Sequence, residues 1–441
     1  STRVPTGKGD LPVQQKSKRL RGYFIAYIMA FGAIFLTVCM VQYPDASFEA
    51  AAQGLQVWFE IVFPALLPFF IAGQILMGLG VVHFLGVLLE PFMRPIFNIP
   101  GAGAFVVAMG LASGYPVGAA LTAELRRREL VSRTEAERLM SFSNTADPLF
   151  MFGAVAVGMF GLAPVGVTIS LSHYISTIMV GILLRFYGRQ EDPVSAPPKK
   201  EQGEQGNIMT RALKALYRAR IEDGRPFGQL MGDSIRQSVN TLLLVGGFII
   251  LFSVVIRVAT IVGLTRMLGH FIARLLIPLG LQPTLAEACI SGLFEVTIGC
   301  NLASSAANSA GPGLAPLIQR VAIASGIISW SGISVHCQVA AVVNDTDIRI
   351  TPFVLARFLH GILSAIVAVF LFKYGAPVLT NLALPVFSQA AALPVWAYPI
   401  VRFRYIGTRI GGVLLLLCLL SAAYNIITRI RLIPFWIKKG N

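Results

Sequence analysis

The stretch SGYPVGAALT, residues Ser113–Thr122, interrupts an apolar run with glycine, proline and polar side chains. A weak echo of it, FEVTIGCNLA, follows about 180 residues later at Phe294–Ala303. Either stretch alone would make a poor transmembrane helix. Non-helical backbone lies at membrane depth only where protein or a water-filled cavity satisfies its N–H and C=O groups. A pair of such interruptions in corresponding positions of two halves is typical of the substrate site of a secondary transporter.

The composition excludes an ordinary soluble globule. Of the 441 residues, 55% are hydrophobic and only 13% are charged, whereas soluble domains average about 25% charged residues. Six apolar runs approach the roughly 20 residues that cross a bilayer: Tyr23–Val41, Pro64–Val82, Val165–Phe186, Thr241–Val262, Thr351–Phe372 and Gly407–Ile427. The sequence therefore predicts an all-α polytopic membrane protein.

The charge distribution predicts the orientation. The formal net charge is +15, and the basic residues cluster beside the apolar runs, where they keep segments cytoplasmic and meet anionic headgroups. No nucleic-acid motif accompanies them, so we expect the lipid bilayer and no nucleic acid as a partner. Residues 1–22 and the tail after the last helix should be cytoplasmic. The stretch EDPVSAPPKKEQGEQG is typical of a disordered linker. The following IMTRALKALYRARI predicts a basic amphipathic helix on the cytoplasmic surface, or else a regulatory partner site.

The predicted cytoplasmic positions of the termini and the linker divide the chain into two units of opposite orientation. With both termini and the linker cytoplasmic, each unit crosses the membrane an odd number of times, which predicts an inverted repeat. The predicted boundaries are a basic N-terminus (1–22), a first transmembrane helix (23–47), repeat 1 (48–187) with a hairpin near 101–122, a linker (188–232), repeat 2 (233–376) with a hairpin near 283–307, and a C-terminal segment with the last transmembrane helix (377–441).

The run SGYPVGAALTAELRRRELVSRTEAERLMSFSNTADPLFMFGAV at Ser113–Val155 resembles the sporulation integral membrane proteins of the YlbJ/SpoVV family, within the group that carries the nucleoside-recognition or "gate" domain. The resemblance extends from about Tyr23 to Ile427. It implies a fold like that of concentrative nucleoside transporters, with two re-entrant hairpins meeting near the membrane centre. It also implies transport of dipicolinic acid across the outer forespore membrane during endospore formation.

A planar aromatic dianion needs hydrogen-bond donors for its carboxylates and a surface for its ring. At the first hairpin, Gly114 allows close backbone approach, Pro116 can open a helix whose N-terminal N–H groups bind an anion, Ser113 can cap it, and Tyr115 can stack on the ring. A packing kink is the alternative. The other candidate substrate-binding residues lie in the second hairpin and the polar stretches: Ser143, Asn144, Thr145, Glu295, Thr297, Gly299, Asn301, Ser329, Ser331 and Ser334. Helix caps and interhelical contacts are the alternative for these.

Two acidic residues are candidates for coupling transport to a cation. Glu295 interrupts the second hairpin and Asp147 lies in the polar run of the first half, where an acid costs about 2.5–3.5 kcal/mol to insert at the bilayer centre. A protonated acid, a bound cation or a basic partner would each account for them. His173 and His360 could be hydrogen-bonded interior histidines or proton carriers.

The sequence has no GxSxG, HExxH or P-loop motif, so we expect neither an enzyme nor a cofactor or metal. The coupling ion is left open, and the chain could form a homo-oligomer. The alternatives to dipicolinate transport are transport of nucleosides or another small organic anion, and a non-transporting sporulation scaffold.

Overall fold

The computed structural model describes residues 13–188, 208–309 and 311–374, with five further positions between 408 and 419. Over these ranges every regular element is a helix, the helices are joined by turns and loops, and the β-structure is limited to one isolated bridge between Ala307 and Leu314. The first half comprises α1 (Val13–Gln42), α2 (Pro44–Val57), η1 (Trp58–Val62), α3 (Phe63–Gly78), α4 (Val81–Phe92), η2 (Met93–Phe97), α5 (Gly103–Ser113), α6 (Val117–Arg127), α7 (Arg133–Ser143), η3 (Phe150–Met159) and α8 (Val165–Leu184). The second half comprises α9 (Ile208–Asp223), α10 (Phe227–Ile261), α11 (Leu264–Leu276), η4 (Ile277–Leu279), α12 (Leu285–Phe294), α13 (Val296–Ser305), α14 (Leu317–Trp330), α15 (Gly332–Val343) and α16 (Ile350–Tyr374).

Several of these helices are long and apolar enough to span a membrane. Four spans pass this test within the described residues, namely α8, α10, the stretch Leu317–Val343 that contains α14 and α15, and α16. Two bent pairs would raise the number to six: Met29–Gln42 with Pro44–Val62, bent by 104°, and Leu66–Gly78 with His83–Phe97, bent by 77°. The predicted all-α polytopic membrane fold is confirmed.

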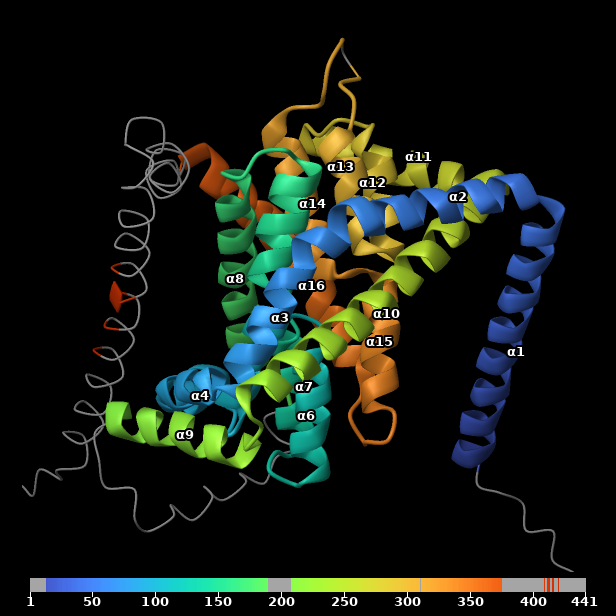
Figure 1. Cartoon of the computed structure of the whole chain (residues 1–441). Coiled ribbons are helices and arrows are strands. Elements are labelled where there is room, and N and C mark those ends of the chain that lie inside the picture. The colour runs from blue at the N-terminus through green and yellow to red at the C-terminus, as the bar shows by residue number, and fades with distance from the viewer. Residues whose placement is uncertain are drawn as a thin grey trace, which may run out of the picture.

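The two halves repeat the same order of elements. In each half a long helix (α3, α10) is followed by a short one (α4, α11), a hairpin (α5–α6, α12–α13), an interrupted helix (α7–η3, α14–α15) and a closing helix (α8, α16). Equivalent elements lie at opposite edges of the molecule: α4 and α6 at the lower edge in Figure 1, and α11, α12 and α13 at the upper edge. This is the arrangement expected of an inverted repeat with two re-entrant hairpins.

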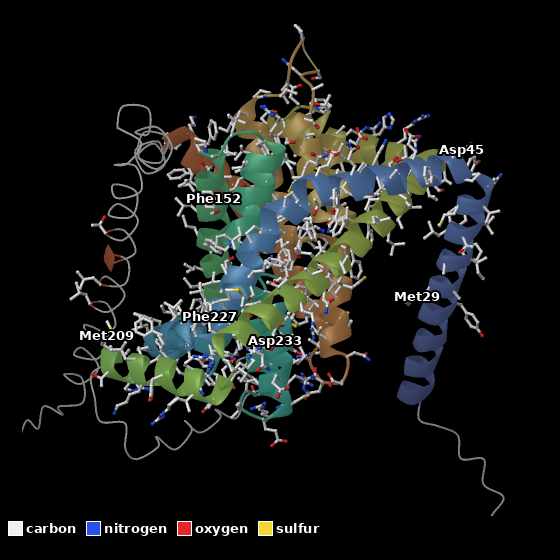
Figure 2. All side chains as sticks on the ribbon, viewed as in Figure 1. Met29, Asp45, Phe152, Met209, Phe227 and Asp233 are labelled. Carbon is white, nitrogen blue, oxygen red and sulfur yellow. The ribbon has the colours of Figure 1, made fainter. Side chains whose placement is uncertain are left out.

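Some boundaries differ from the predicted ones. The first helix ends at Gln42 rather than near residue 47, because Pro44 begins α2, and proline is favoured at the first turn of a helix. Helix α1 lies to one side of the molecule, and most of it, including the part where Met29 is labelled, stands apart from the other helices (Figure 2). Helix α10 begins at Phe227, ahead of both the apolar run at Thr241 and the predicted repeat boundary at residue 233, because its polar first turns continue the same helix. Of the predicted last transmembrane helix, only the five positions between 408 and 419 are described, and all five are helical.

The largest apolar core joins the two halves. It gathers buried residues of η1, α3, η3 and α8 with buried residues of α10, α12, α13 and α14. The indole N–H of Trp58 donates to the carbonyl of Leu242 on α10 at 2.9 Å. The predicted amphipathic helix is α9, which crosses the lower edge in Figure 1 beside α4. There Arg211 pairs with Glu90 at 2.7 Å.

Ion pairs join the charged end of the first hairpin to the second half. Arg126 on α6 pairs with Asp347, in the loop between α15 and α16, at 2.8 Å, and Arg127 pairs with Asp345 at 2.9 Å. The hydrogen bond from the Arg126 guanidinium lowers the pKa of the Asp347 carboxyl below its usual value of 3.8. The arginines at the end of α6 therefore form ion pairs with the second repeat, in addition to local pairs with Glu124.

Candidate functional site

The tip of the first hairpin packs directly against the break in the helix that follows it. Helix α5 ends at Ser113 and α6 begins at Val117, with Gly114 at φ +71° between them. A Cβ on Gly114 would lie 2.8 Å from Oδ2 of Asp147, and one on Gly118 would lie 2.5 Å from the carbonyl oxygen of Ser143. Only glycine permits this approach. Pro116 directly precedes α6, as predicted. Ser113 is the last residue of α5 and does not cap α6, which has no side-chain cap.

The second hairpin makes the equivalent contact. Helix α12 ends at Phe294 and α13 begins at Val296. The break between α14 and α15 falls at Ser331 and Gly332, both at positive φ. A Cβ on Gly332 would lie 3.0 Å from the Phe294 carbonyl oxygen and 3.1 Å from the Val296 nitrogen. In each half, the hairpin tip therefore lies against the break of the next helix.

Hydrogen bonds join the two pairs of breaks to each other. The hydroxyl of Tyr115, at the first hairpin tip, donates to the carbonyl of Ile328 on α14 at 3.3 Å. Nδ1 of His173 lies 2.8 Å from the hydroxyl oxygen of Ser329, and Nε2 of His173 accepts from the Ala146 N–H at 3.1 Å. Because Nε2 accepts, the proton of the neutral imidazole is on Nδ1 and faces Ser329. The polar residues predicted from the two halves thus meet in the interior.

Each half places one buried carboxylate at the start of a helix. Oδ1 of Asp147 accepts from the N–H groups of Leu149 and Phe150 at 2.9 and 2.8 Å. Oε2 of Glu295 accepts from the Ile298 N–H at 2.7 Å. Both side chains are at most 5% exposed. They stabilise the positive ends of η3 and α13, and a role in coupling stays a prediction.

The most unusual group in this region is Arg357 of α16, which the sequence reasoning missed. It is fully buried, and none of its three guanidinium nitrogens has a hydrogen-bond partner among the described residues. It lies on α16, which packs against α7, α8 and α14. An arginine inside the apolar run Thr351–Phe372 was the available signal, because a charge within a membrane segment usually has a function.

Asn144 is another buried polar residue whose side chain has no partner among the described residues. It directly follows α7, is fully buried, and neither atom of its side-chain amide has a partner within the described ranges. The hydroxyl of Ser143 is in the same state. Buried polar groups are normally hydrogen-bonded, so the unpartnered side chains of Ser143, Asn144 and Arg357, on the adjacent segments around α7 and α16, are exceptional, and we call them the polar centre.

The remaining predicted residues lie around this centre in structural roles. The Thr145 hydroxyl donates to the Gly110 carbonyl at 3.2 Å, and Thr297 is buried in the first turn of α13. The indole N–H of Trp330 donates to the Leu293 carbonyl at 3.1 Å. The other four are Gly299, at the close approach of α12 and α13, Asn301, whose carbonyl accepts from Ser304 and Ser305, and the buried Ser331 and Ser334. In the described part of the chain, no three His, Cys, Asp or Glu side chains gather as a metal site would need.

Re-entrant hairpins that meet interrupted helices inside a membrane-spanning body define a transporter-like membrane protein. The family profile described as "Gate: Nucleoside recognition" matches residues 59–163. The sporulation integral membrane protein YlbJ of Bacillus subtilis is 46% identical over 347 residues, covering 77% of this chain and 81% of that protein. The chain belongs to the family of this sporulation membrane protein.

Two weaker likenesses accompany this relation. An uncharacterised protein of Alkalihalophilus pseudofirmus is 26% identical over 177 residues, covering 39% of this chain and 36% of that protein. Among solved structures, the concentrative nucleoside transporter CNTnw in an inward-facing substrate-bound state is 12% identical with a TM-score of 0.43, over 82% of this chain and 87% of that chain. A CNTnw variant in an outward-facing state is 14% identical with a TM-score of 0.39, over 82% and 88%.

Proposed function

We propose that this protein is a secondary transporter that moves dipicolinic acid across the outer forespore membrane of a sporulating bacterium. One observation supports transport: four helix interruptions meet in the protein interior. They are the two hairpin tips (α5–α6 and α12–α13) and the two helix breaks (α7–η3 and α14–α15), and the hydrogen bond between Tyr115 and Ile328 joins the two halves. Interrupted helices expose backbone groups and helix ends to a small cargo at membrane depth. Membership of a family of sporulation membrane proteins supports the cargo and the membrane.

The proposal includes an orientation and excludes an enzymatic reaction. Both termini and the segment between α8 and α9 lie on the cytoplasmic, mother-cell side, as the basic residues beside the membrane segments favour. The protein has no catalytic role, cofactor or resident metal. Its partners are the lipid bilayer and a small-molecule cargo, a coupling ion acts at Glu295 or Asp147, and self-association into a homo-oligomer is compatible with this role.

A second candidate cargo is a nucleoside, because the gate profile that matches residues 59–163 is described as nucleoside recognition. The two cargoes differ in charge, since dipicolinate is a dianion at neutral pH and a nucleoside is neutral. They therefore require different sites, and one experiment can separate them.

The test is uptake by the purified protein in proteoliposomes of labelled dipicolinate and, in parallel, labelled uridine. We expect saturable dipicolinate uptake that excess unlabelled dipicolinate suppresses and excess uridine does not. Empty liposomes and liposomes with heat-denatured protein are the controls. Uridine uptake without dipicolinate uptake would refute the proposed cargo, and uptake of neither, by protein shown to be folded, would refute transport of both.

A further inference from the structure

Two buried arginines of the second half differ in how their charge is satisfied. Arg320 on α14 donates from Nε to the Ala315 carbonyl at 2.9 Å and from a terminal nitrogen to the Ser304 carbonyl, and its guanidinium lies 5.8 Å from the centre of the Phe160 ring. Arg357 on α16 has no such bonds within the described residues. The guanidinium does not lose its proton inside a protein. A buried charge without a partner is costly, so Arg357 requires a counter-charge that the described chain does not provide.

The nearby acids do not provide that counter-charge. Asp147 and Glu295 direct their oxygens to backbone N–H groups at the starts of η3 and α13. Neither accepts a hydrogen bond from Arg357 in the described structure. The helix ends already stabilise both carboxylates, and the charge of Arg357 stays uncompensated.

Asn144 lies at the same level as Arg357 on the helix beside it. Helices α7 and α16 pack together and run in the same direction: Glu137 bonds to Arg349 at 2.8 Å near their starts, and Met140 and Phe353 share one apolar cluster a turn later. One turn further along, Asn144 directly follows the end of α7, at the level of Arg357 on α16. Beyond it, Ala146 bonds to His173, whose carbonyl oxygen is 3.0 Å from Nε2 of His360.

We propose that Arg357 and Asn144 bind an anionic carboxylate of the cargo between α7 and α16, beside Tyr115 of the first hairpin. The planar guanidinium fork donates two parallel hydrogen bonds to a carboxylate, and the side-chain amide of Asn144 supplies a further N–H donor. This assignment rests on the proposed transport function and names the class of its cargo, an organic carboxylate anion. On this assignment, the preference for anionic over neutral cargo depends on the charge of Arg357.

The first experiment measures binding by thermal shift and by calorimetry in detergent. The ligands are dipicolinate, its neutral diamide, isophthalate, glutarate and uridine. We expect dipicolinate to stabilise the wild-type protein and the neutral diamide to have no effect. In Arg357→Gln, dipicolinate affinity should fall by about 30-fold or more, the loss expected when a buried charge pair is broken. Arg320→Gln is the matched control, with dipicolinate affinity kept and melting temperature lowered.

The unliganded variants distinguish a binding role from a structural one. Removing a buried charge that nothing pairs should leave the melting temperature of ligand-free Arg357→Gln equal to or above that of the wild type. A structural arginine would lower it, as at Arg320. Asn144→Leu, which removes the amide at similar volume, should weaken dipicolinate binding in the same direction, and Arg357→Lys should retain part of it because the charge stays.

The outcomes separate this inference from the proposed function. If dipicolinate does not bind but isophthalate or glutarate does, and Arg357→Gln abolishes that binding, the dipicolinate cargo is wrong and the anion site stands. If dipicolinate binds equally well to the wild type, Arg357→Gln and Asn144→Leu, the site is refuted and dipicolinate transport stands. If no anion binds the folded wild type, or if uridine alone binds, the site is refuted. Should Arg357→Gln fail to fold, Arg357→Lys and Asn144→Leu decide, and unchanged affinity in both refutes the inference.

Discussion

Replacing Gly114 with alanine tests whether the tip of the first hairpin must touch the break after α7. Two effects add at this position. The backbone at φ +71° and ψ −171° belongs to a region open essentially to glycine alone, which costs other residues about 1–3 kcal/mol. The new Cβ would also lie 2.8 Å from Oδ2 of Asp147, and displacing this carboxylate removes the cap of η3, worth about 1 kcal/mol. We expect Gly114→Ala to lower the free energy of unfolding by about 2–4 kcal/mol.

Gly280→Ala is the matched control. Gly280 has the same φ of +71°, and a Cβ on it would have no atom within 4 Å other than those of its own chain neighbours. This variant should show the left-handed backbone cost alone, about 1–2 kcal/mol. Equilibrium unfolding in mixed micelles compares the two variants, and proteoliposome uptake of dipicolinate follows in the same preparations. Gly114→Ala should lose uptake and Gly280→Ala should keep it. Equal stability and equal uptake of the two variants would contradict the contact between the hairpin tip and Asp147.

The remaining predictions concern coupling, pH and orientation. Glu295→Gln keeps an oxygen that can accept from the Ile298 N–H, so it should cost less than about 1 kcal/mol but remove the dependence of uptake on an imposed proton or sodium gradient. An unchanged gradient response would exclude Glu295 as the coupling group. Arg126→Gln should cost no more than about 1 kcal/mol at neutral pH, because the pair with Asp347 is partly exposed. The pKa of Asp347 is lowered by folding, so this contribution is present above pH 4 and disappears as the pH falls further, and a difference between Arg126→Gln and wild type that persists in acid would contradict the assignment. A single cysteine at position 195, in a protein lacking the five native cysteines, should react with a membrane-impermeant label only from the cytoplasmic side. Labelling from the opposite side would contradict the proposed orientation.

The closing helices and hairpins were predictable because their signals are local. The run Val165–Phe186 corresponds to α8 (Val165–Leu184), and Thr351–Phe372 to α16 (Ile350–Tyr374). Both are uniform apolar segments with clear ends. The hairpins could be predicted from residues that do not suit a continuous apolar helix, such as Gly114 and Glu295. Here a polar or flexible residue in an apolar run marks the break directly.

The centre of the site could not be predicted as a whole, because it depends on contacts between residues far apart in sequence. The local sequence does not show that Asn144 and Arg357 lie at the same level beside each other. It also does not show that the ring of His173 hydrogen-bonds to both Ser329 and Ala146. The presence of Arg357 in an apolar run was visible in the sequence, but not whether its charge has a partner. Burial and missing partners, which identify this arginine, exist only in three dimensions.

If the protein transports its cargo as proposed, the bonds from the first half to Ile328 and Ser329 restrict which parts of it can move against each other. These neighbouring residues sit at the end of α14, directly before the break, and they are held by the first hairpin through Tyr115 and by α8 through His173. A rigid-body displacement of the hairpin alone would break the bond from Tyr115, whereas a displacement of α14 alone would break both. A moving body that includes the first hairpin, α8 and the end of α14 would keep both bonds intact, so the boundary between moving and stationary parts would not coincide with the boundary between the two repeats.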